Sequence, residues 1–399
     1  MTTHQQGLER AGVRVLLQAV SRHLGRDLAP DWREAAEATP RHRFLPDRVW
    51  LSGDDDVLVP CDRGHEPDHW FAAAYADEPV VTQINDGQDP EDLADASPSS
   101  SASAPSIVFQ MLELLGLAPG MRVLEIGAGT GFNAALLSHR LGDTNVTTIE
   151  IDPTVAELAR SNLKANGYAP AVVCGDGSLG WSGEAPFDRV VATCSVRRVP
   201  YAWIEQTRPG GVILTPWCDD WSHGGLLRLT VGDDGTATGR YTPDSAFMLM
   251  RTQRRDLRLF RDVVMDEHVP DESTTTLDPW AVADSEFETQ FALGHRLGDL
   301  WYAWHHDPDL DDVKTRLWVA TTDGDSWAAV DWDGTEDTEG TERYTVWQHG
   351  PRRLWDEVET AHRWWLDNDR PGPSRLGLTV GPGGHQAWLD DPTNAWPLP

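Results

Sequence analysis

The first hundred residues carry helical periodicity only near their N-terminal end. Apolar side chains recur every three to four residues from Leu8 to His23, which predicts an amphipathic helix, and Pro30 to Ala38 predicts a second one. Between Leu51 and Leu93 the pattern weakens and acidic residues accumulate, as in the runs at 54–56 and 89–92. We expect an exposed loop there, because charged stretches without apolar periodicity are typical of surface segments.

From residue 107 onward, helical and strand patterns alternate. Ile107 to Leu117 predicts a helix, and Arg208-Pro-Gly-Gly predicts a turn that leads into a strand. The predicted strands are the run that begins at Arg122, Val146 to Ile151, Ala171 to Cys174, Phe187 to Cys194, 212–215, Gly224 to Val231 and Gly239 to Met250. Strands that alternate with helices in this way favour an α/β fold.

A glycine-rich turn follows the first of these strands. The sequence from Arg122 to Asn133 reads R-V-L-E-I-G-A-G-T-G-F-N and leads directly into a helix. Its spacing, G-x-G-x-G, is one residue tighter than the G-x-G-x-x-G that holds a pyrophosphate. Taken alone, such a turn also occurs in α/β proteins of other functions. Its candidate cofactor-binding residues are Glu125, Gly127, Ala128, Gly129, Gly131 and Asn133.

Two further acids indicate which nucleotide the turn holds. Glu150, followed by Ile151, ends the second strand, where a carboxylate can accept both hydroxyls of a ribose. Asp176, followed by Gly177, comes after the third strand and is expected beside the adenine edge. This order of strands, turn and acids is typical of class I methyltransferases. We therefore predict a Rossmann-like sheet that binds S-adenosylmethionine and releases S-adenosylhomocysteine.

Composition narrows the range of partners. The chain has 399 residues, which predicts two domains. Its formal net charge of -31 argues against nucleic acid as a partner, because nucleic-acid affinity depends on basic surface. Neither a signal sequence nor a long apolar run is present, so we expect a soluble cytoplasmic protein without a membrane partner.

The four cysteines stand singly along the chain. Cys61, Cys174, Cys194 and Cys218 form no C-x-x-C pair and have no histidine pairs at metal spacing, and two of them lie in predicted core strands. We therefore expect buried thiols in a reducing compartment and no metal site.

The composition changes near residue 250. Fourteen of the 19 tryptophans lie after residue 216, in short aromatic runs separated by Asp/Gly turns. We predict a first domain over 1–250, with a helical N-terminal part (1–80) and a cofactor-binding core (104–250), and a second α+β or mainly β domain over 251–399. Tryptophan suits both a core and a binding surface, so the second domain either packs its tryptophans inside or uses them to recognise a peptide.

Several ordered blocks resemble the protein-L-isoaspartate O-methyltransferase family over about the first 250 residues. They are P-R-H-R-F-L-P (40–46), S-A-P (103–105), M-L-E-L-L-G-L-A-P-G-M-R-V-L-E-I-G-A-G-T-G-F-N-A-A-L-L (111–137), G-D-G-S-L-G-W (175–181), A-P-F-D-R-V-V-A-T (185–193) and R-P-G-G-V-I-L-T-P (208–216). The resemblance implies a doubly wound sheet with a reversed last strand pair, and a carboxylate as the methyl acceptor.

The resemblance also implies a catalytic position. The family has a serine in a T-x-S-A-P-H-like segment next to the substrate carboxylate. Here Ser103 takes the position of that serine, Ser101 that of the threonine, and Ser106 that of the histidine. The alternative is that this Ser/Pro/Ala-rich tract is a flexible linker.

Two departures from the family bear on the substrate. The chain has an acidic stretch around Asp86 to Ala96 and about 150 additional C-terminal residues. Both departures argue against repair of damaged proteins. The longer chain, with its T-V-G-P-G-G-H-Q-A-W-L-D-D-P segment (379–392), is similar to actinobacterial relatives that modify ribosomally made peptides such as lanthipeptides and graspetides. That similarity implies a modified precursor peptide as partner, with an aspartate esterified and then converted to aspartimide and often isoaspartate. The rivals are an isoaspartyl repair enzyme with an accessory domain and an inactive peptide-binding module. The oligomeric state stays open, with a monomer favoured.

Clustered arginines offer positive charge for an acidic peptide. Arg197 and Arg198 follow a predicted strand end, where substrates lie in such folds. Arg251 and Arg254 begin a denser group that continues with Arg255, Arg258 and Arg261. We expect substrate contacts from Arg197, Arg198, Arg251 and Arg254, and the alternative is a solvated face or pairing with the abundant acids.

Overall fold

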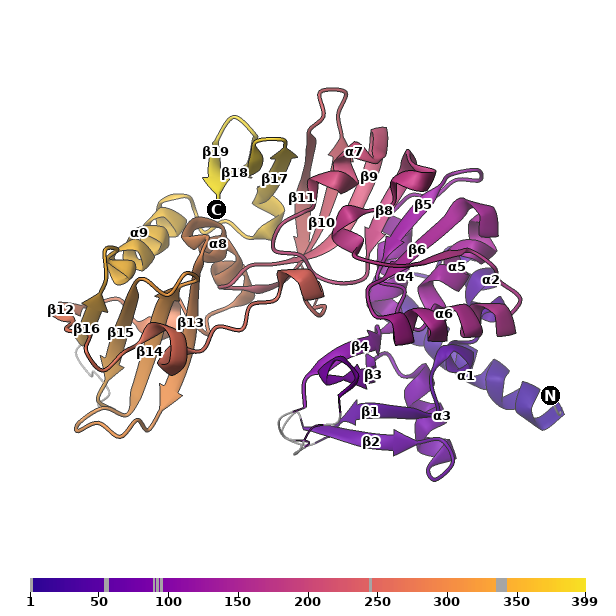
Figure 1. The fold of residues 1–399 in the computed structure, drawn as a ribbon, viewed down its shortest axis with the longest axis horizontal. Helices are drawn as coiled ribbons and strands as arrows, with labels where there is room; N and C mark the ends of the chain where they lie inside the picture. Colours follow the sequence, from indigo (N-terminus) through magenta and orange to yellow (C-terminus); the bar gives the residue numbers. More distant parts are fainter. Residues whose placement is uncertain are drawn as a thin grey trace. The chain divides into compact units, whose positions relative to one another are not determined.

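The computed structural model describes residues 3–53, 57–88, 90, 93, 96–243, 246–334 and 343–399. The chain divides into two compact units, drawn in Figure 1. The first contains Met1–Ser195, Val199–Pro216 and Arg228–Ala237, and the second contains Val196–Arg198, Trp217–Leu227 and Thr238–Pro399. This division differs from a single boundary at residue 250, because two short segments around residues 197 and 220 group with the C-terminal part.

The N-terminal part of the first unit combines helices with a small antiparallel sheet. Both helices expected from periodicity are present, and the second has the predicted bounds. The sheet has the order β2-β1-β3-β4. The elements are α1 (Thr3–Leu24), α2 (Pro30–Ala38), η1 (Arg41–Phe44), β1 (Arg48–Ser52), β2 (Leu58–Asp62), α3 (Pro67–Tyr75), β3 (Val80–Ile84), η3 (Asn85–Gly87), β4 (Pro98–Ala102) and α4 (Pro105–Leu114).

The exposed loop expected between Leu51 and Leu93 is therefore wrong for most of its length. Strands β2 and β3 and helix α3 occupy it, and α3 buries Trp70, Ala74 and Tyr75. These elements are five to nine residues long, too short to establish an apolar period in the sequence. The acidic run at 54–56, and residues 89, 91, 92, 94 and 95 of the acidic stretch, lie outside the described residues.

The rest of the first unit is a parallel sheet flanked by helices. Neighbouring strands follow the order β10-β9-β8-β5-β6-β7, and the pairs from β9 to β7 are parallel. Helices α5 and α6 pack beside β6 (Figure 1). The elements are β5 (Val123–Ile126), α5 (Phe132–Leu141), η5 (Asp143–Asn145), β6 (Val146–Glu150), α6 (Pro153–Ala165), β7 (Ala171–Cys174), η6 (Gly177–Leu179), η7 (Ser182–Glu184), β8 (Phe187–Ala192), α7 (Tyr201–Glu205), β9 (Thr207–Cys218) and β10 (His223–Val231).

The strand order places a topological switch point beside β5. Its neighbours β6 and β8 continue the chain in opposite directions across the sheet, and ligands of doubly wound folds bind at such a point, outside the carboxyl ends of the strands. The α/β fold predicted from the sequence is confirmed. The turn expected at Arg208-Pro-Gly-Gly belongs instead to β9, which pairs with β8 through an irregular register.

The second unit is built around an antiparallel sheet of order β12-β16-β15-β14-β13, covered by helices. Helix α9 packs on β14, β15 and β16, and α8 packs on α9 (Figure 1). The elements are β11 (Ala237–Pro243), η8 (Arg251–Gln253), η9 (Leu259–Val263), β12 (Asp271–Thr275), η10 (Pro279–Ala281), α8 (Phe287–Leu297), β13 (Leu300–His306), β14 (Thr315–Thr321), β15 (Trp327–Trp332), β16 (Tyr344–His349), α9 (Leu354–Asp367), η11 (Pro373–Arg375), β17 (Leu376–Gly381), β18 (Gly384–Leu389) and β19 (Ala395–Leu398). The strand expected over Gly239 to Met250 is thus shorter and ends at Pro243.

Many tryptophans of the second unit build its core. Trp221 and Trp355 lie in a cluster with Leu293, Leu317 and Val346. On the other face of β14, Trp318 and Trp327 pack with Val263. The large indole side chains bury much apolar area on both faces of this sheet.

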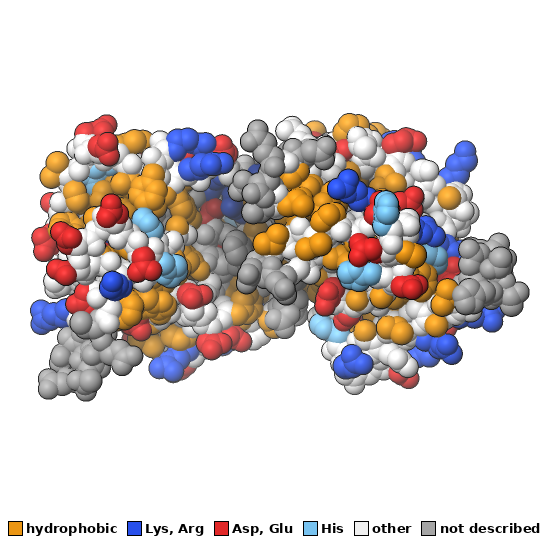
Figure 2. Space-filling view, turned by 90° about the horizontal axis from the view of Figure 1, so that it is seen from below, with side chains coloured by type: hydrophobic (Ala, Val, Ile, Leu, Met, Phe, Trp, Pro, Cys, Tyr) orange, Lys and Arg blue, Asp and Glu red, His pale blue; other side chains and the backbone are white. Residues whose placement is uncertain are grey.

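On the face drawn in Figure 2, acidic and basic side chains are interspersed. Among the described residues, no helix has the length and apolar character needed to cross a membrane. Cys61 and Cys218 are buried as expected, whereas Cys194 is half-buried and Cys174 is exposed, which corrects the prediction for these two residues. Strand β7 is at the sheet edge, so no further strand covers the end of β7 where Cys174 lies.

Candidate active site

The glycine turn between β5 and α5 is held by main-chain hydrogen bonds. The N–H groups of Gly127 and Ala128 both donate to the carbonyl oxygen of Ile149, at 2.8 and 3.0 Å. Gly131 has a φ of 86°, and a Cβ there would lie 3.2 Å from the Ala159 carbonyl oxygen. Glycine therefore lets the start of α5 approach α6 closely in a left-handed conformation.

Glu150 joins this turn to the end of β6. One carboxylate oxygen accepts a hydrogen bond from the Gly129 N–H at 3.0 Å, and the other accepts from the Asp152 N–H at 3.1 Å. Asp152 in turn caps α6 by accepting from the Thr154 N–H at 2.8 Å. The side chain of Ile151, between these two acids, is exposed. The sequence thus places an ordered carboxylate and an apolar side chain at the carboxyl end of β6, as predicted.

Asp176 occupies the corresponding place after β7. Its carboxylate accepts from the Ser178 N–H at 2.9 Å and caps η6. A Cβ on Gly177 would lie 2.5 Å from Cγ2 of Ile126, so only glycine allows η6 to lie against β5. The Trp203 indole N–H donates to the Gly177 carbonyl oxygen at 2.8 Å and fixes the segment from the other side.

Glu125 lies at the bottom of the site and is fully buried. Its Oε1 accepts a hydrogen bond from the Asn133 amide at 2.7 Å, while Oε2 has no partner among the described residues. Burial raises the pKa of this carboxyl to about 7. A buried carboxylate with an open acceptor is costly unless a donor or a positive charge meets it.

These features fit S-adenosylmethionine. The cofactor carries an ammonium and a sulfonium charge, and Glu125 and Glu150 supply negative charge on two sides of the turn. A Cβ on Gly129 would project toward the Ser101 carbonyl oxygen at 3.7 Å, so glycine leaves room there for a bound group. The predicted cofactor residues Glu125, Gly127, Ala128, Gly129, Gly131, Asn133, Glu150, Ile151, Asp176 and Gly177 thus gather around the carboxyl ends of β5, β6 and β7.

The serine tract is a strand and not a flexible linker. Ser101 lies in β4 and pairs with Val81 of β3, and Ser103 follows the strand directly before α4. Both side chains are half-buried, and neither hydroxyl makes a hydrogen bond to a described residue. Ser106 is buried, and its N–H donates to the Asp77 carboxylate at 2.8 Å. The close approach of Ser101 to Gly129 brings this strand to the cofactor turn.

Sequence reasoning missed the residue that fixes the serine tract. Arg41 is fully buried, and its guanidinium donates to the carbonyl oxygens of Ala102 and Ser103 at 2.9 and 3.0 Å. It also donates to the carbonyl oxygens of Ala74, Ala76 and Glu78. The signal was present in the P-R-H-R-F-L-P block, but a single arginine in a sequence gives no indication that it will be buried.

The predicted substrate arginines lie in the second unit, where acids hold several of them. The Arg197 guanidinium pairs with Asp220 at 2.9 Å, and Arg255 pairs with the other oxygen of Asp220 at 2.8 Å. Arg198 is exposed. Arg251 begins η8 and Arg254 follows it, and both make interactions within the chain. Arg258 and Arg261 pair with Asp256, and Arg261 also pairs with Asp262.

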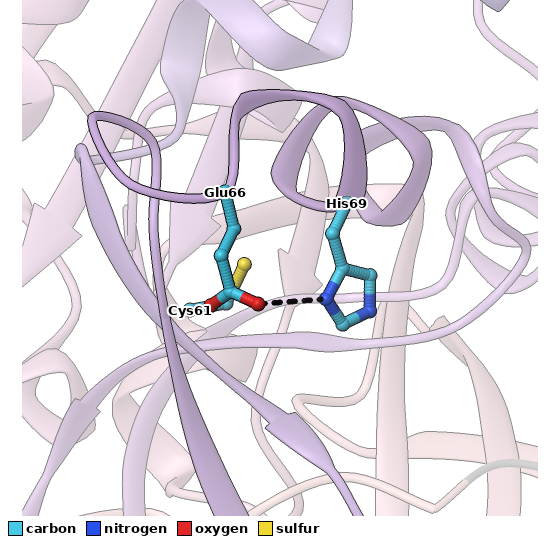
Figure 3. A group of neighbouring side chains, drawn as sticks. All are labelled: Cys61, Glu66 and His69. Carbon is cyan, nitrogen blue, oxygen red and sulfur yellow. Dashed lines mark ion pairs between the residues drawn. The ribbon is translucent and has the colours of Figure 1, made fainter.

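One group in the first unit has a metal-ligating composition. Cys61, Glu66 and His69 offer ligand atoms that all lie within 4.8 Å of one another (Figure 3). Glu66 and His69 form an exposed ion pair of 3.9 Å, and burial raises the pKa of the Cys61 thiol. A raised pKa opposes the thiolate that a metal needs. This group was not expected from the sequence, because Cys61 of β2, His69 of α3 and Glu66 directly before α3 all lie in a stretch that was expected to be loop.

Comparison with known proteins identifies the family. The family model described as Protein-L-isoaspartate(D-aspartate) O-methyltransferase (PCMT) matches residues 55–249. The protein-L-isoaspartate O-methyltransferase of Methanosarcina mazei is 37% identical over 216 residues, which cover 52% of this chain and 82% of the relative. That of Methanopyrus kandleri is 42% identical over 186 residues, covering 46% of this chain and 67% of the relative.

A solved structure extends the likeness in fold along nearly the whole chain. The structure titled protein-L-isoaspartate O-methyltransferase has a TM-score of 0.53 at 20% sequence identity, covering 95% of this chain and 100% of that chain. The fold of that solved structure therefore matches parts of both units of this chain. With the glycine turn, the acids at the strand ends and the serine strand in place, the chain belongs to the protein-L-isoaspartate O-methyltransferase family and is an S-adenosylmethionine-dependent methyltransferase.

Proposed function

We propose that the enzyme esterifies the side-chain carboxylate of an aspartate in a cyclised ribosomal peptide precursor. The ester then closes to an aspartimide and often opens to isoaspartate. The observation that carries the site is the approach of the Ser101 carbonyl oxygen to Gly129, because it sets the serine strand beside the cofactor turn. Ser103, two residues further, then has a free hydroxyl to offer a carboxylate.

The cofactor roles follow from the placement of each group. We assign the ribose hydroxyls to Glu150, whose carboxylate is oriented by two main-chain N–H groups. The exposed Ile151 is assigned to one face of the adenine and Asp176 to its edge. The amino-acid end of the cofactor is assigned to Glu125 and the glycine turn, where the open carboxylate oxygen meets a positive charge.

The reaction requires alignment more than acid or base chemistry. An aspartate carboxylate is ionised near pH 7, so no general base has to remove a proton before it attacks. The Ser103 hydroxyl donates a hydrogen bond to one carboxylate oxygen and leaves the other to attack in line, with Ser101 beside it. S-adenosylmethionine supplies a methyl group whose bond to sulfur breaks as the bond to the carboxylate oxygen forms. Correct orientation of this kind accounts for a large share of such rate enhancements.

The aspartimide step needs no further group from the enzyme. Once the carboxylate is esterified, the main-chain nitrogen of the next peptide residue attacks the ester carbonyl and methanol leaves. The ring that forms is a succinimide, and water opens it at either carbonyl.

One feature supports an aspartate in a modified peptide over isoaspartate in damaged proteins. Ser106 replaces the histidine of the family segment, and its side chain is buried and small, so the substrate side of α4 lacks an imidazole. The second unit adds a separate body of residues that a folded or cyclised substrate can contact. We assign it to recognition of the peptide.

Isoaspartyl repair is the second candidate, and one observation favours it. The solved structure with the repair enzyme's title matches 95% of this chain, so a C-terminal extension of this fold also occurs under that title. The extension by itself therefore does not separate the two substrates. An inactive peptide-binding module is disfavoured by the ordered Glu150 and Asp176, which such a module would not need.

The test is a competition between three substrates. The protein and S-adenosylmethionine are incubated with an isoaspartyl peptide, a linear aspartyl peptide and the same aspartyl peptide cyclised, and the products are followed by mass spectrometry. We expect a gain of one methyl group, followed by loss of methanol, on the cyclised peptide. Efficient methylation of the isoaspartyl peptide with none of the cyclised one would establish the repair function instead. If the protein fails to bind S-adenosylmethionine in calorimetry, the inactive peptide-binding module becomes the favoured function.

A further inference from the structure

The second unit contains a pocket apart from the cofactor turn. Its volume is about 270 Å³, and all of its lining residues belong to the second unit. They come from the segments around residues 197 and 220, from α8 and the loop after it, and from Arg255, Thr322, Leu398 and Pro399. Gly294 of α8 lies against Asp219 so closely that a Cβ there would be 2.3 Å from the Asp219 carboxylate. Glycine at this position therefore lets the helix form one wall of the pocket.

The pocket lining contains three arginines and three aspartates, namely Arg197, Arg198, Arg255, Asp219, Asp220 and Asp299. The three guanidinium groups differ in whether an acid already binds them. Arg197 and Arg255 share the carboxylate of Asp220, with one oxygen each at 2.9 and 2.8 Å. Arg198 also lines the pocket, and its guanidinium has no hydrogen-bond or ion-pair partner among the residues that the structure describes. The ion pairs of Arg197 and Arg255 with Asp220 show that a carboxylate fits against these guanidinium groups. The Arg198 guanidinium is available to bind another carboxylate.

Four buried polar atoms in the pocket wall make no hydrogen bond within the described part of the chain, although Oδ2 of Asp219 lies 3.9 Å from Nδ1 of His295. Two of them are donors, the indole N–H of Trp217 and the Nε–H of Arg197. The other two are acceptors, Oδ2 of Asp219 and Nε2 of His295. Nδ1 of His295 lies 2.8 Å from the Phe291 carbonyl oxygen, which can only accept a hydrogen bond, so Nδ1 carries the proton. Nε2 of the neutral imidazole is therefore an acceptor. Trp217 is 2% exposed, His295 1% and Asp219 8%, so water reaches these side chains poorly.

The arginines and the buried donors and acceptors of the pocket together match an acidic residue within a peptide chain. A carboxylate suits the arginines, since guanidinium groups bind carboxylates through charge-assisted hydrogen bonds. A peptide group offers one C=O and one N–H, which suits a wall that holds both open donors and open acceptors. A phosphate fits less well, because the carboxylates of Asp219 and Asp220 lie in the same wall and would repel its second charge.

We infer that this pocket binds an aspartate or glutamate residue of the peptide substrate, with its carboxylate at Arg198 and Arg255 and its main-chain amide at Trp217 and Asp219. The inference rests on the proposed function only in taking a peptide as the substrate. It gives the second unit a defined contact with that peptide and identifies acidic residues as the feature that is recognised.

Binding to the full-length protein tests this directly. The probes are blocked pentapeptides, acetyl-Gly-Gly-Asp-Gly-Gly-amide and its Asn counterpart, titrated by calorimetry without cofactor. We expect the Asp peptide to bind and the Asn peptide to bind at least about tenfold more weakly, as for loss of one charge-assisted hydrogen bond. Arg198→Ala and Trp217→Phe should each raise Kd of the Asp peptide by about the same factor. Arg363→Ala, which removes an exposed charge on α9, is the matched control and should change nothing.

Three results would overturn the inference. They are equal binding of the Asp and Asn peptides, unchanged binding in both pocket variants, and binding of N-acetylaspartate as tightly as the pentapeptide, which would indicate a site for free carboxylic acids. A Ser103→Ala variant separates this inference from the proposed function. Pentapeptide binding that persists in Ser103→Ala and falls in Arg198→Ala supports the pocket, whether or not methyl transfer occurs.

Discussion

Nη2 of the buried Arg41 donates a hydrogen bond to the carbonyl oxygen of Ser103 at 3.0 Å. The same guanidinium holds Ala102, Ala74, Ala76 and Glu78 through their carbonyl oxygens. One side chain therefore ties the end of β4 to the segment after α3. The position of the Ser103 hydroxyl depends on this contact, although Arg41 itself lies outside the reacting groups and acts as a positioning residue.

Arg41→Lys should lower both stability and turnover. A lysine ammonium has three donors on a flexible stem and cannot satisfy carbonyl oxygens spread around a planar guanidinium. We expect the free energy of unfolding to fall by ~2–4 kcal/mol, since buried carbonyl groups lose their partners. Urea denaturation measures that loss, and kinetics should show kcat falling more than the Kd for S-adenosylmethionine rises. Arg22→Lys, at an exposed site on α1, is the control. A stable variant with normal kcat would show that Arg41 does not position Ser103.

Glu125→Gln should change how stability depends on pH. Burial raises the pKa of Glu125 in the folded protein to about 7, above its ordinary value of 4.5. The folded state then binds more protons than the unfolded state between pH 4.5 and 7. This group therefore lowers the free energy of unfolding as pH rises through that window. Glutamine cannot ionise and keeps the acceptor for Asn133. We expect the stability of Glu125→Gln relative to the wild type to increase by ~2 kcal/mol from pH 5 to pH 8 in urea denaturation. A constant difference across this range would contradict a raised pKa.

Asp176→Asn and Glu150→Gln should differ in their effects on cofactor binding. Asparagine at 176 keeps an oxygen for the Ser178 N–H, so only the contact with the cofactor changes. Glutamine at 150 must place an NH2 against the N–H of Gly129 or of Asp152, which distorts the turn. By calorimetry, we expect S-adenosylmethionine affinity to fall about tenfold for Asp176→Asn and more for Glu150→Gln. Equal affinities in both variants and the wild type would remove these residues from the cofactor site.

Gly129→Ala should fold yet bind the cofactor poorly. The added methyl group would lie 3.7 Å from the Ser101 carbonyl oxygen, an ordinary contact distance, although the φ of 52° costs an alanine about 1 kcal/mol. The methyl group would occupy the space between β4 and the turn. We expect a thermal shift with S-adenosylmethionine in the wild type and little or none in the variant. Gly7→Ala, in open surroundings on α1, should retain the full shift. A normal shift in Gly129→Ala would place the cofactor elsewhere.

The sequence predicted the parallel core well because long apolar runs and glycine turns leave few alternatives. Helix α2 and strand β7 have the bounds expected from their patterns. The small sheet of β1 to β4 was missed, since five-residue strands with mixed burial have too short a period to be detected. Arg41 was missed for a different reason. Its role arises from carbonyl groups of two separate segments, 74–78 and 102–103, and no local pattern in a sequence encodes such convergence.

In the second unit, sequence patterns predicted the secondary structure better than the contacts between distant side chains. Its β content and its tryptophan core were expected, but the pocket around Asp219 and His295 depends on side chains more than 70 residues apart. Arg197 was selected for its position after a strand, and the structure pairs it with Asp220. The number of acids in the chain made such pairing foreseeable, whereas the partner of each arginine depends on the fold.

Single-turnover methylation of a cyclised aspartyl peptide tests whether Ser103 orients a substrate carboxylate for methyl transfer. The wild type, Ser103→Ala and Ser97→Ala are compared at saturating S-adenosylmethionine, with Ser97 as an exposed serine just before β4. We predict a rate about a hundredfold lower for Ser103→Ala, because a misaligned nucleophile loses that order of rate. Cofactor affinity should be unchanged, and Ser97→Ala should match the wild type. Equal rates in Ser103→Ala and the wild type would show that Ser103 does not orient the substrate carboxylate.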